Sequence, residues 1–522
     1  MCELMDRAVD LGGNVSGLID TDGSLSTWPQ VSSRVRRLAQ TLVASGVEPG
    51  DRICIAHPRS TASFVAVHAT LHAGAVMVPL DPLGPSASLI SVIEAVEPVA
   101  IIGASATLAK RLGDFLPDSN QIIVHNGPSA PLTQLGILGD RLISFDAGVA
   151  DADSFTLPHV VETDMAYIIF TSGSTGVPKG IVHTHASGLA CAKMGATAHG
   201  MTPTDRLAAT TPLHFDISTL DLYGVPWAGA SAIAVTEAEV RFPASLAKRL
   251  ATTSATMIFT TPYQLLQLAG RGDIGNCDLT ALRQIAFGGE AFAPGALVEL
   301  AQTYPPAELL NVYGPAEVYG VTVHSFGVRP SHIETVSIGV PCPEVQLVIV
   351  DDSDTPVPAG VSGEMLVHSP TMMNGYWRRD DLNSTSFLEL DGTRFYRTGD
   401  LAYLDSAGLL QFEGRRDNRI KVRGVRIELE EIERVLEDAP GVAHAVAGLV
   451  HDASGIQHIA AWVVPQEGEP LDAAGLAKRC RARLPANAVP TSFVQLKSMP
   501  TTATGKIDRA TLRASAVNPG AD

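Results

Sequence analysis

The sequence predicts a layered α/β fold in a large N-terminal domain, followed by a smaller α+β domain. Its 522 residues exceed what one ordinary core holds, so we expect at least two domains. Apolar runs of strand length alternate with helical stretches through most of the chain, which is typical of sheets covered by helices. After Gly414 this alternation stops and a different pattern begins.

The N-terminal domain contributes most of the predicted elements. The stretch 31–45, VSSRVRRLAQTLVAS, has the apolar spacing of an amphipathic helix. Strand-like apolar runs lie at 53–57, 76–80, 99–103, 166–170 and 257–261. Strands and helices that alternate in this way predict layered α/β architecture.

The smaller domain is predicted from three segments. The stretch 427–439, IELEEIERVLEDA, predicts a short amphipathic helix. The apolar face of this helix would carry Ile432, Val435 and Leu436. The runs 442–450 and 457–464 predict strands, which gives this part of the chain an α+β character.

Composition and charge exclude several classes of protein. Hydrophobic residues make up 45% of the chain and charged residues 18%, which indicates a chain that folds throughout. The net charge of −18 argues against a general nucleic-acid binder. The basic stretch 414–426 is a local exception, but acidic residues follow at 428–433. We therefore favour a solvated strand face over a nucleic-acid patch.

The N-terminus and the cysteines bear on the compartment. The first ten residues, MCELMDRAVD, lack the basic start and apolar core of a signal peptide. No run reaches the roughly 18 apolar residues of a membrane helix, so we expect a cytoplasmic protein without membrane contact. The six cysteines are scattered and form no Cys-x-x-Cys pair, which argues against structural zinc and a disulfide framework.

A glycine-rich loop carries the strongest local signal. The stretch 171-TSGSTGVPKG-180 follows the apolar run 166–170 directly. Its glycines let backbone N–H groups approach a ligand, and its hydroxyls and Lys179 add donors and charge, which predicts a phosphate-binding loop. It is not a Walker A loop, because Pro178 precedes the lysine and Gly180 follows it. A flexible surface turn is the alternative for this stretch alone.

Further motifs accompany the loop. They are 311-NVYGPAEVYG-320, 396-YRTGD-400, 414-GRRDNRIKVRG-424 and 500-PTTATGKIDR-509, with shorter pieces at 73–82, 215–218, 288–291 and 338–341. With them the chain resembles the adenylate-forming enzymes, the superfamily of nonribosomal-peptide adenylation domains, acyl-CoA synthetases and luciferases. The resemblance runs from about residue 25 to the end. It implies a large domain at 1–413 and a small mobile lid domain at 414–522, with the hinge at Asp417.

The resemblance implies an ATP site with Mg²⁺. In relatives the loop holds the β- and γ-phosphates, and two aromatic rings flank the adenine. Asp400 resembles the family aspartate that accepts hydrogen bonds from both ribose hydroxyls, and Arg415 resembles a second ribose contact. The ATP-binding residues would be Thr171, Ser172, Gly173, Ser174, Thr175, Gly176, Lys179, Asn311, Tyr313, Asp400, Phe412 and Arg415. Glu317 would hold Mg²⁺. Without the resemblance, Asp400 is a turn residue, the rings are core aromatics and Glu317 is a surface glutamate.

The resemblance also assigns two half-reactions to one chain. Lys506 would bridge the substrate carboxylate and the phosphate during adenylation. The lid would then rotate about Asp417 and bring the strand around Gly424 to the site for transfer to a thiol. Two departures from the family pattern, Ala316 in place of threonine and Thr504 in place of asparagine, remove no charge. They bear on efficiency rather than on the reaction.

The predicted substrate is a small neutral α-amino acid such as alanine, glycine or serine. Asp216 matches the family residue that pairs with the substrate α-ammonium group; the alternative is an N-cap for a helix at 217–225. The other pocket walls carried over from the family are Ile217, Leu220, Phe259, Ala286, Gly288, Val312, Gly320 and Val321. None of these is charged, and three are bulky, which favours a small neutral side chain.

The thiol acceptor is expected to come in trans. The sequence contains no Gly-Gly-x-Ser attachment site of a fused carrier domain after its last motif. A separate phosphopantetheinylated carrier protein is the favoured acceptor, because Asp417 resembles the hinge of the peptide-synthetase branch. The alternatives are an acyl-CoA ligase for a small carboxylic acid and a non-catalytic ATP-sensing or scaffold protein of the same fold.

Overall fold

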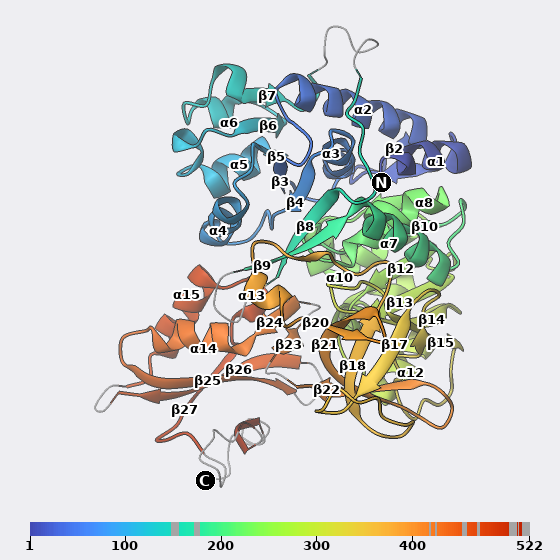
Figure 1. Ribbon diagram of the computed structural model, residues 1–522, viewed down its shortest axis with the longest axis vertical. Coiled ribbons are helices and arrows are strands. Elements are labelled where there is room, and N and C mark those ends of the chain that lie inside the picture. Colours follow the sequence, from blue (N-terminus) through green and yellow to red (C-terminus); the bar gives the residue numbers. More distant parts are fainter. Residues whose placement is uncertain are drawn as a thin grey trace. The chain divides into compact units, whose positions relative to one another are not determined.

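The computed structural model of the protein divides into two compact units. It describes residues 1–147, 156–171, 178–416, 419–422, 425–451, 457–466, 470–500, 509 and 511–513. The first unit combines Met1–Pro82, Val92–Phe170 and Gly180–Arg416, and the second combines Leu83–Ser91, Thr171–Lys179 and Asp417–Asp522 (Figure 1). A large α/β unit and a smaller α+β unit confirm the fold class that the sequence predicts.

The first unit contains a nine-stranded sheet in the order β16-β15-β14-β13-β12-β10-β11-β1-β2. Its strands are β1 (Gly17–Ile19), β2 (Leu25–Thr27), β10 (Arg206–Ala209), β11 (Ser231–Ala234), β12 (Met257–Thr260), β13 (Gln284–Gly288), β14 (Glu308–Tyr313), β15 (Thr322–Val328) and β16 (Val340–Pro341). The central strands β1 and β10 to β14 pair in parallel, and the edges pair antiparallel. All carboxyl ends of the central strands therefore lie along one edge of the sheet.

Two further sheets complete the first unit. An eight-stranded sheet runs β19-β9-β8-β4-β3-β5-β6-β7. Its strands are β3 (Arg52–Ala56), β4 (Val76–Pro79), β5 (Ala100–Ala104), β6 (Ile122–Asn126), β7 (Leu142–Ser144), β8 (Met165–Thr171), β9 (Lys179–Thr184) and β19 (Gly375–Tyr376). An antiparallel sheet contains β17 (Gln346–Val350), β18 (Gly363–His368), β20 (Phe387–Leu390), β21 (Thr393–Leu404) and β22 (Leu410–Arg415).

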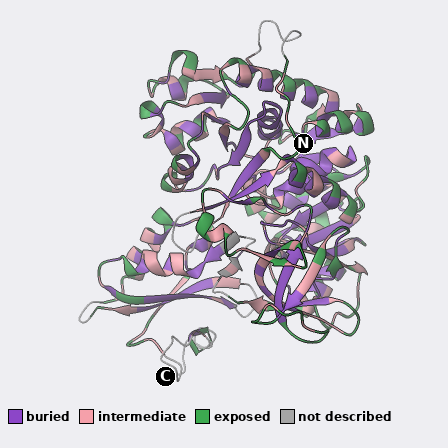
Figure 2. Cartoon of the chain, viewed as in Figure 1, coloured by how far each residue is buried: buried purple, intermediate pink, exposed green. Residues whose placement is uncertain are grey.

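Helices cover the two large sheets. They are α1 (Glu3–Gly12), α2 (Trp28–Ala44), α3 (Thr61–His72), α4 (Ser86–Val96), α5 (Ser105–Leu112), α6 (Ala130–Thr133), α7 (His185–Ala198), α8 (Val225–Ala228), α9 (Glu237–Arg241), α10 (Pro243–Thr252), α11 (Pro262–Arg271), α12 (Pro294–Thr303) and α13 (Asp380–Asn383). The strands of the two large sheets are mostly buried, and most helices carry both buried and exposed residues, whereas α3 is buried along its whole length (Figure 2). In the part of the chain that the structure describes, no helix combines the length and apolarity needed to cross a lipid bilayer.

The chain is helical over residues 218–228, close to the range 217–225 considered in the sequence analysis. Within this segment a π-helical turn, η4 (Leu220–Gly224), precedes the short helix α8. Pro226 has no backbone N–H, so it cannot bond to the carbonyl of Leu222 as an α-helix requires. That carbonyl accepts a hydrogen bond from His68 Nε2 at 2.9 Å. Burial lowers the pKa of His68 to about 3, which keeps its ring neutral for this contact.

The second unit has its own core. Its described elements include β23 (Arg419–Val422), β24 (Val425–Glu428), α14 (Leu429–Glu437), β25 (Val442–His451), β26 (Gln457–Pro465), α15 (Ala473–Arg483) and β27 (Ser492–Gln495). The predicted strands at 442–450 and 457–464 are confirmed, and the predicted helix begins later, because 425–428 pairs with β23. Ile432 and Leu436 are buried, and Val435 packs against the same cluster.

Candidate active site

Four predicted pocket residues share one face of the nine-stranded sheet. Phe259 on β12 lies opposite Ala286 on β13, and Gly288 on β13 lies opposite Val312 on β14. Ala286 and Gly288 are two residues apart, so their Cβ positions fall on the same face. Phe259, Gly288 and Val312 lie in the carboxyl halves of their strands and Ala286 lies at the centre of β13; open parallel sheets bind their ligands at the carboxyl ends.

The space on this face is narrow at Gly288. A Cβ atom at this position would lie 2.3 Å from the carbonyl oxygen of Val312 and 3.4 Å from the Phe259 ring. Any side chain at position 288 therefore collides with the backbone of the neighbouring strand. A Cβ on Gly320 would lie 3.6 Å from Val312 Cγ1, which is ordinary contact. The predicted walls at 288 and 320 thus both adjoin Val312.

The turn after β10 supplies more of the predicted pocket. Leu220 belongs to the same hydrophobic cluster as Phe259 and Ala286, and Ile217 packs against that cluster. The half-buried Asp216 accepts a hydrogen bond from the backbone N–H of Ile217 at 3.0 Å through Oδ1. The helical segment begins at Ser218, two residues after Asp216, and the backbone N–H of Thr219 donates to the carbonyl oxygen of Asp216 at 2.9 Å. The N-cap alternative for Asp216 therefore stays open.

Val321 lies apart from these residues in the packing of the core. It is fully buried in another cluster, with Val318 and Tyr396. Its backbone N–H donates to the carbonyl oxygen of Tyr313 at 2.7 Å. Val321 therefore packs in a different hydrophobic cluster from Leu220, Phe259 and Ala286.

Tyr319 is a site residue that sequence reasoning missed. It has a φ of 61°, a left-handed backbone conformation that is rare for a tyrosine. Burial raises the pKa of its phenol, and the nearby Cys191, Asp216 and Asp221 raise it further. Tyr319 lies within the motif 311–320, but the motif does not reveal its positive φ, which depends on the surrounding fold.

The predicted nucleotide residues come together on three strands. Tyr313 Oη, at the end of β14, donates to Asp400 Oδ2, and Arg415 Nη1 donates to Asp400 Oδ1. Asp400 and Arg415 face each other across β21 and β22. The Tyr313 and Phe412 rings lie 6.2 Å apart at a tilt of 39°. An aromatic pair beside a carboxylate and a guanidinium suits a base and a ribose.

Glu317 is buried, not a solvated surface residue. Its side chain accepts a hydrogen bond from Tyr376 Oη at 2.7 Å, and Tyr376 Oη lies 3.4 Å from Tyr396 Oη. His183 Nε2 lies 3.3 Å from the carbonyl oxygen of Ala316, and burial lowers the pKa of this histidine to about 4. Sequence reasoning missed Tyr376, which reaches Glu317 from a distant segment, and His183, which reaches the neighbouring Ala316.

The remaining predicted nucleotide residues differ in how far the structure describes them. Thr171 ends β8, and Lys179 begins β9. Lys179 Nζ lies 3.2 Å from Glu428 Oε1 in a buried ion pair; both residues belong to the second unit. Asn311 donates to the carbonyl oxygen of Ser337 at 2.9 Å. The predictions for Ser172, Gly173, Ser174, Thr175, Gly176, Asp417, Gly424 and Lys506 lie outside the described residues.

Comparison with known proteins decides the family. The profile described as AMP-binding enzyme matches residues 8–377. The chain belongs to the AMP-binding enzyme family. A second profile, the AMP-binding enzyme C-terminal domain, matches residues 431–506 of this AMP-binding enzyme. The two matches confirm the resemblance to adenylate-forming enzymes that the sequence motifs predict.

Relatives of this AMP-binding enzyme differ in length. It is 31% identical over 505 residues to phosphinothricin tripeptide synthetase PhsB from Streptomyces viridochromogenes, a match covering 94% of this chain and 40% of PhsB. It is 28% identical over 498 residues to an L-proline:L-prolyl-carrier protein ligase from Pseudomonas fluorescens, covering 95% of each. Amide bond synthetase McbA from Marinactinospora thermotolerans superposes with a TM-score of 0.86 at 25% identity, over 99% of this chain and 100% of McbA. The chain thus spans less than half the length of PhsB.

Proposed function

We propose that the protein activates a small neutral α-amino acid with ATP as the aminoacyl adenylate. It then transfers the aminoacyl group to the phosphopantetheine thiol of a separate carrier protein. The observation that carries the proposal is the shared face of Phe259, Ala286, Gly288 and Val312, with Asp216 on the adjoining turn. The similarity to an L-prolyl-carrier protein ligase over 95% of both chains supports the carrier acceptor.

The size of the substrate follows from the walls. Leu220 and Phe259 fill space beside the sheet, and both belong to the same buried cluster as Ala286. Asp216 supplies the negative charge that an α-ammonium group requires in apolar surroundings. A small uncharged side chain suits this combination better than a bulky or charged one.

The chemistry at the phosphate is mainly electrostatic. A substrate carboxylate oxygen bonds to the α-phosphorus of ATP while the bond to pyrophosphate breaks. In this proposal Arg415 and Asp400 orient the ribose, Tyr313 and Phe412 the adenine, and Lys506 the two reacting anions. The lid at 414–522 turns about Asp417, and Gly424 lies beside the thiol arm in the second half-reaction.

Mg²⁺ fits the residues present. Described residues contain no cluster of three or more metal-binding side chains, but Mg²⁺ at nucleotides needs only one or two carboxylates besides phosphates and water. Glu317 offers a buried carboxylate for this purpose. The bound ion would spread the charge of the phosphates.

Pyrophosphate exchange tests the proposal. We expect small neutral α-amino acids, and not their deaminated analogues, to drive labelled pyrophosphate into ATP. Exchange driven by simple carboxylic acids but not by amino acids would favour the acyl-CoA ligase. If none of the acids drives exchange, the result would favour a non-catalytic binding protein. A second assay offers the adenylate a carrier protein, CoA or an amine. The amine arm is included because McbA, an amide bond synthetase, has nearly the same fold.

A further inference from the structure

A small pocket lies at the carboxyl ends of β1, β10 and β11, beside the start of α3. It has a volume of about 40 Å³ and is lined mainly by apolar side chains, with the polar residues Arg59, Thr61 and Asp221 among them. Thr61 is 2% exposed, and its hydroxyl has no hydrogen-bond partner among the described residues. A buried hydroxyl without a partner costs free energy unless water or a ligand meets it.

Arg59 is fixed to the ends of two strands. Its Nε donates to the carbonyl oxygen of Val235 at 2.6 Å, and its Nη1 donates to that of Thr210. Thr210 follows β10 and Val235 follows β11, so the guanidinium is held at the carboxyl edge of the sheet. Its side chain is buried, and its charge lies in the field of the Glu237 and Asp221 carboxylates.

Asp221 approaches the pocket from the π-helical turn. It follows Leu220, and its carboxyl group has no hydrogen bond or ion pair within the described ranges. Burial raises the pKa of this carboxyl group, and the charge of Arg59 opposes the rise. A cavity needs about 10–15 Å³ to hold one water molecule, so this pocket has room for roughly three.

We propose that ordered water joins Asp221 to Arg59 and Thr61, and that this bridge positions the turn carrying Asp216 and Leu220. Asp221 is then a positioning residue for amino-acid recognition, an inference that rests on the proposed function. The π-helical turn supports it, since such turns are frequent at functional sites. Leu220 is itself a predicted substrate wall in the same cluster as Phe259, and in this proposal water ties its neighbour Asp221 to the sheet edge.

The test compares variants of the full chain by pyrophosphate exchange. Asp221→Leu removes the polar group, and we expect the KM for the amino acid to rise about tenfold while the KM for ATP changes less than about twofold. Asp221→Asn can still form hydrogen bonds with water, so its KM for the amino acid should stay close to the wild-type value. Thr61→Val keeps the shape of the side chain and should raise the amino-acid KM about threefold.

Matched controls separate this role from a loss of stability. Asp205→Asn alters a buried carboxylate at the opposite end of β10 and should leave both KM values unchanged. A lower melting temperature for Asp221→Leu without a change in the amino-acid KM would overturn the inference. If Asp221→Leu does not fold, Thr61→Val and Asp221→Asn carry the comparison.

A crystal structure gives a readout that does not depend on activity. At high resolution we expect water within hydrogen-bonding distance of Asp221, Arg59 and Thr61, and a dry pocket would overturn the bridge. If no amino acid supports pyrophosphate exchange by the wild-type protein, the proposed function itself is contradicted. The two failures are therefore distinguishable.

Discussion

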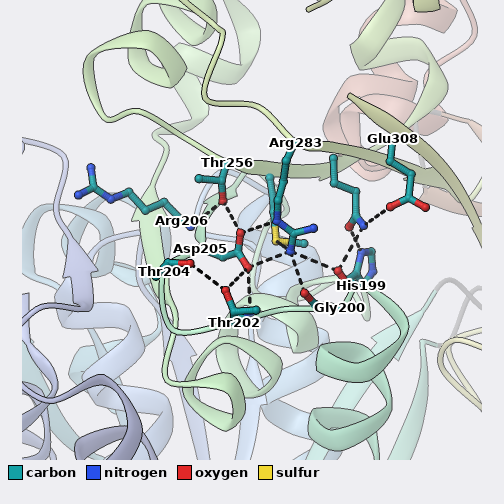
Figure 3. Close-up of polar contacts among 11 residues, drawn as sticks. His199, Gly200, Thr202, Thr204, Asp205, Arg206, Thr256, Arg283 and Glu308 are labelled. Carbon is teal, nitrogen blue, oxygen red and sulfur yellow. Dashed lines mark hydrogen bonds and ion pairs between the residues drawn. The ribbon is translucent and has the colours of Figure 1, made fainter. Parts of the chain in front are cut away.

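The two ends of the nine-stranded sheet differ in the contacts between a buried aspartate and a neighbouring arginine. At the amino ends, Asp205 accepts hydrogen bonds from Arg283 Nε at 2.7 Å, Arg283 Nη2 at 2.8 Å and Thr256 Oγ1 at 2.8 Å (Figure 3). The backbone N–H and the hydroxyl of Thr202 add two more, at 2.8 and 2.9 Å. At the carboxyl ends, Asp221 faces Arg59 across a pocket without such contacts.

This difference separates stability from function. Burial raises the pKa of Asp205, but the hydrogen bonds from Arg283, Thr202 and Thr256 outweigh it, so the pKa lies below its ordinary value. The pKa of Asp221 lies above its ordinary value, because burial outweighs the charge of Arg59. The amino ends are tied together by satisfied contacts, whereas the carboxyl ends keep unsatisfied groups beside the candidate site, as functional sites often do.

The largest effect is expected from a substitution near the carboxyl ends of the strands. Asp216→Ala should lower amino-acid-dependent exchange by about 10²–10³, because a substrate ammonium group would be left without its counter-charge. The KM for ATP should change little. The measurement is kcat/KM for each substrate, with a deaminated acid as the matched probe, which should lose much less. Retained exchange in the variant would show that the carboxylate has no part in substrate binding.

The next largest effect is expected from a substitution at the amino ends of the strands. Asp205→Asn should lower the free energy of unfolding by about 2 kcal/mol, because it weakens the hydrogen bonds that a buried carboxylate accepts from Thr202, Thr256 and the partly exposed Arg283. Exchange activity per folded molecule should stay the same. Urea unfolding and active-site titration measure the two quantities. An unchanged unfolding midpoint would mean that the network contributes no net stability.

A pH series sharpens the comparison. A lowered folded-state pKa, as for Asp205, gives stability that is present above the unfolded pKa of about 3.9 and is lost as the pH falls through the folded pKa. A raised folded-state pKa, as for Asp221, gives stability that is present below a pH of about 3.9, the unfolded pKa, and is lost as the pH rises through the folded pKa. Asp205→Asn should therefore cost more stability at pH 7 than at pH 3.

Asp221→Asn should show the opposite trend and become more favourable relative to wild type as the pH rises. Urea unfolding of both variants at several pH values measures the difference, which should be smaller than the losses above. Parallel pH trends for the two variants would contradict the contrast between the two ends of the sheet.

The smallest expected effect concerns the nucleotide end. Phe412 is 39% exposed, so its ring contributes only part of its surface to any contact. Phe412→Leu should raise the KM for ATP about threefold, as expected for loss of an aromatic contact. The amino-acid KM should not change. A rise in the amino-acid KM alone would place this ring in the wrong part of the site.

Sequence patterns predicted more of the fold than of the site. Local periodicity was enough for the helix at 31–45 and for the strands around 53–57 and 442–450, since both depend on neighbouring residues. It did not predict the π-helical turn within the helix at 218–228, because that turn depends on the missing N–H of Pro226 and on His68 from another segment. Motifs indicated which residues belong to the candidate site, and their roles stay predictions.

By itself, the sequence determined the α/β class, the family motifs and the candidate residues, because periodicity, glycine spacing and charge are local properties of the chain. Only the tertiary structure decided which side chains meet. Tyr313 reaches Asp400 across 87 positions, and Tyr376 reaches Glu317 across 59. The contrast between Asp205 and Asp221 is also tertiary: both are buried aspartates, and their pKa values diverge because strands distant in sequence surround one with donors and leave the other facing a pocket.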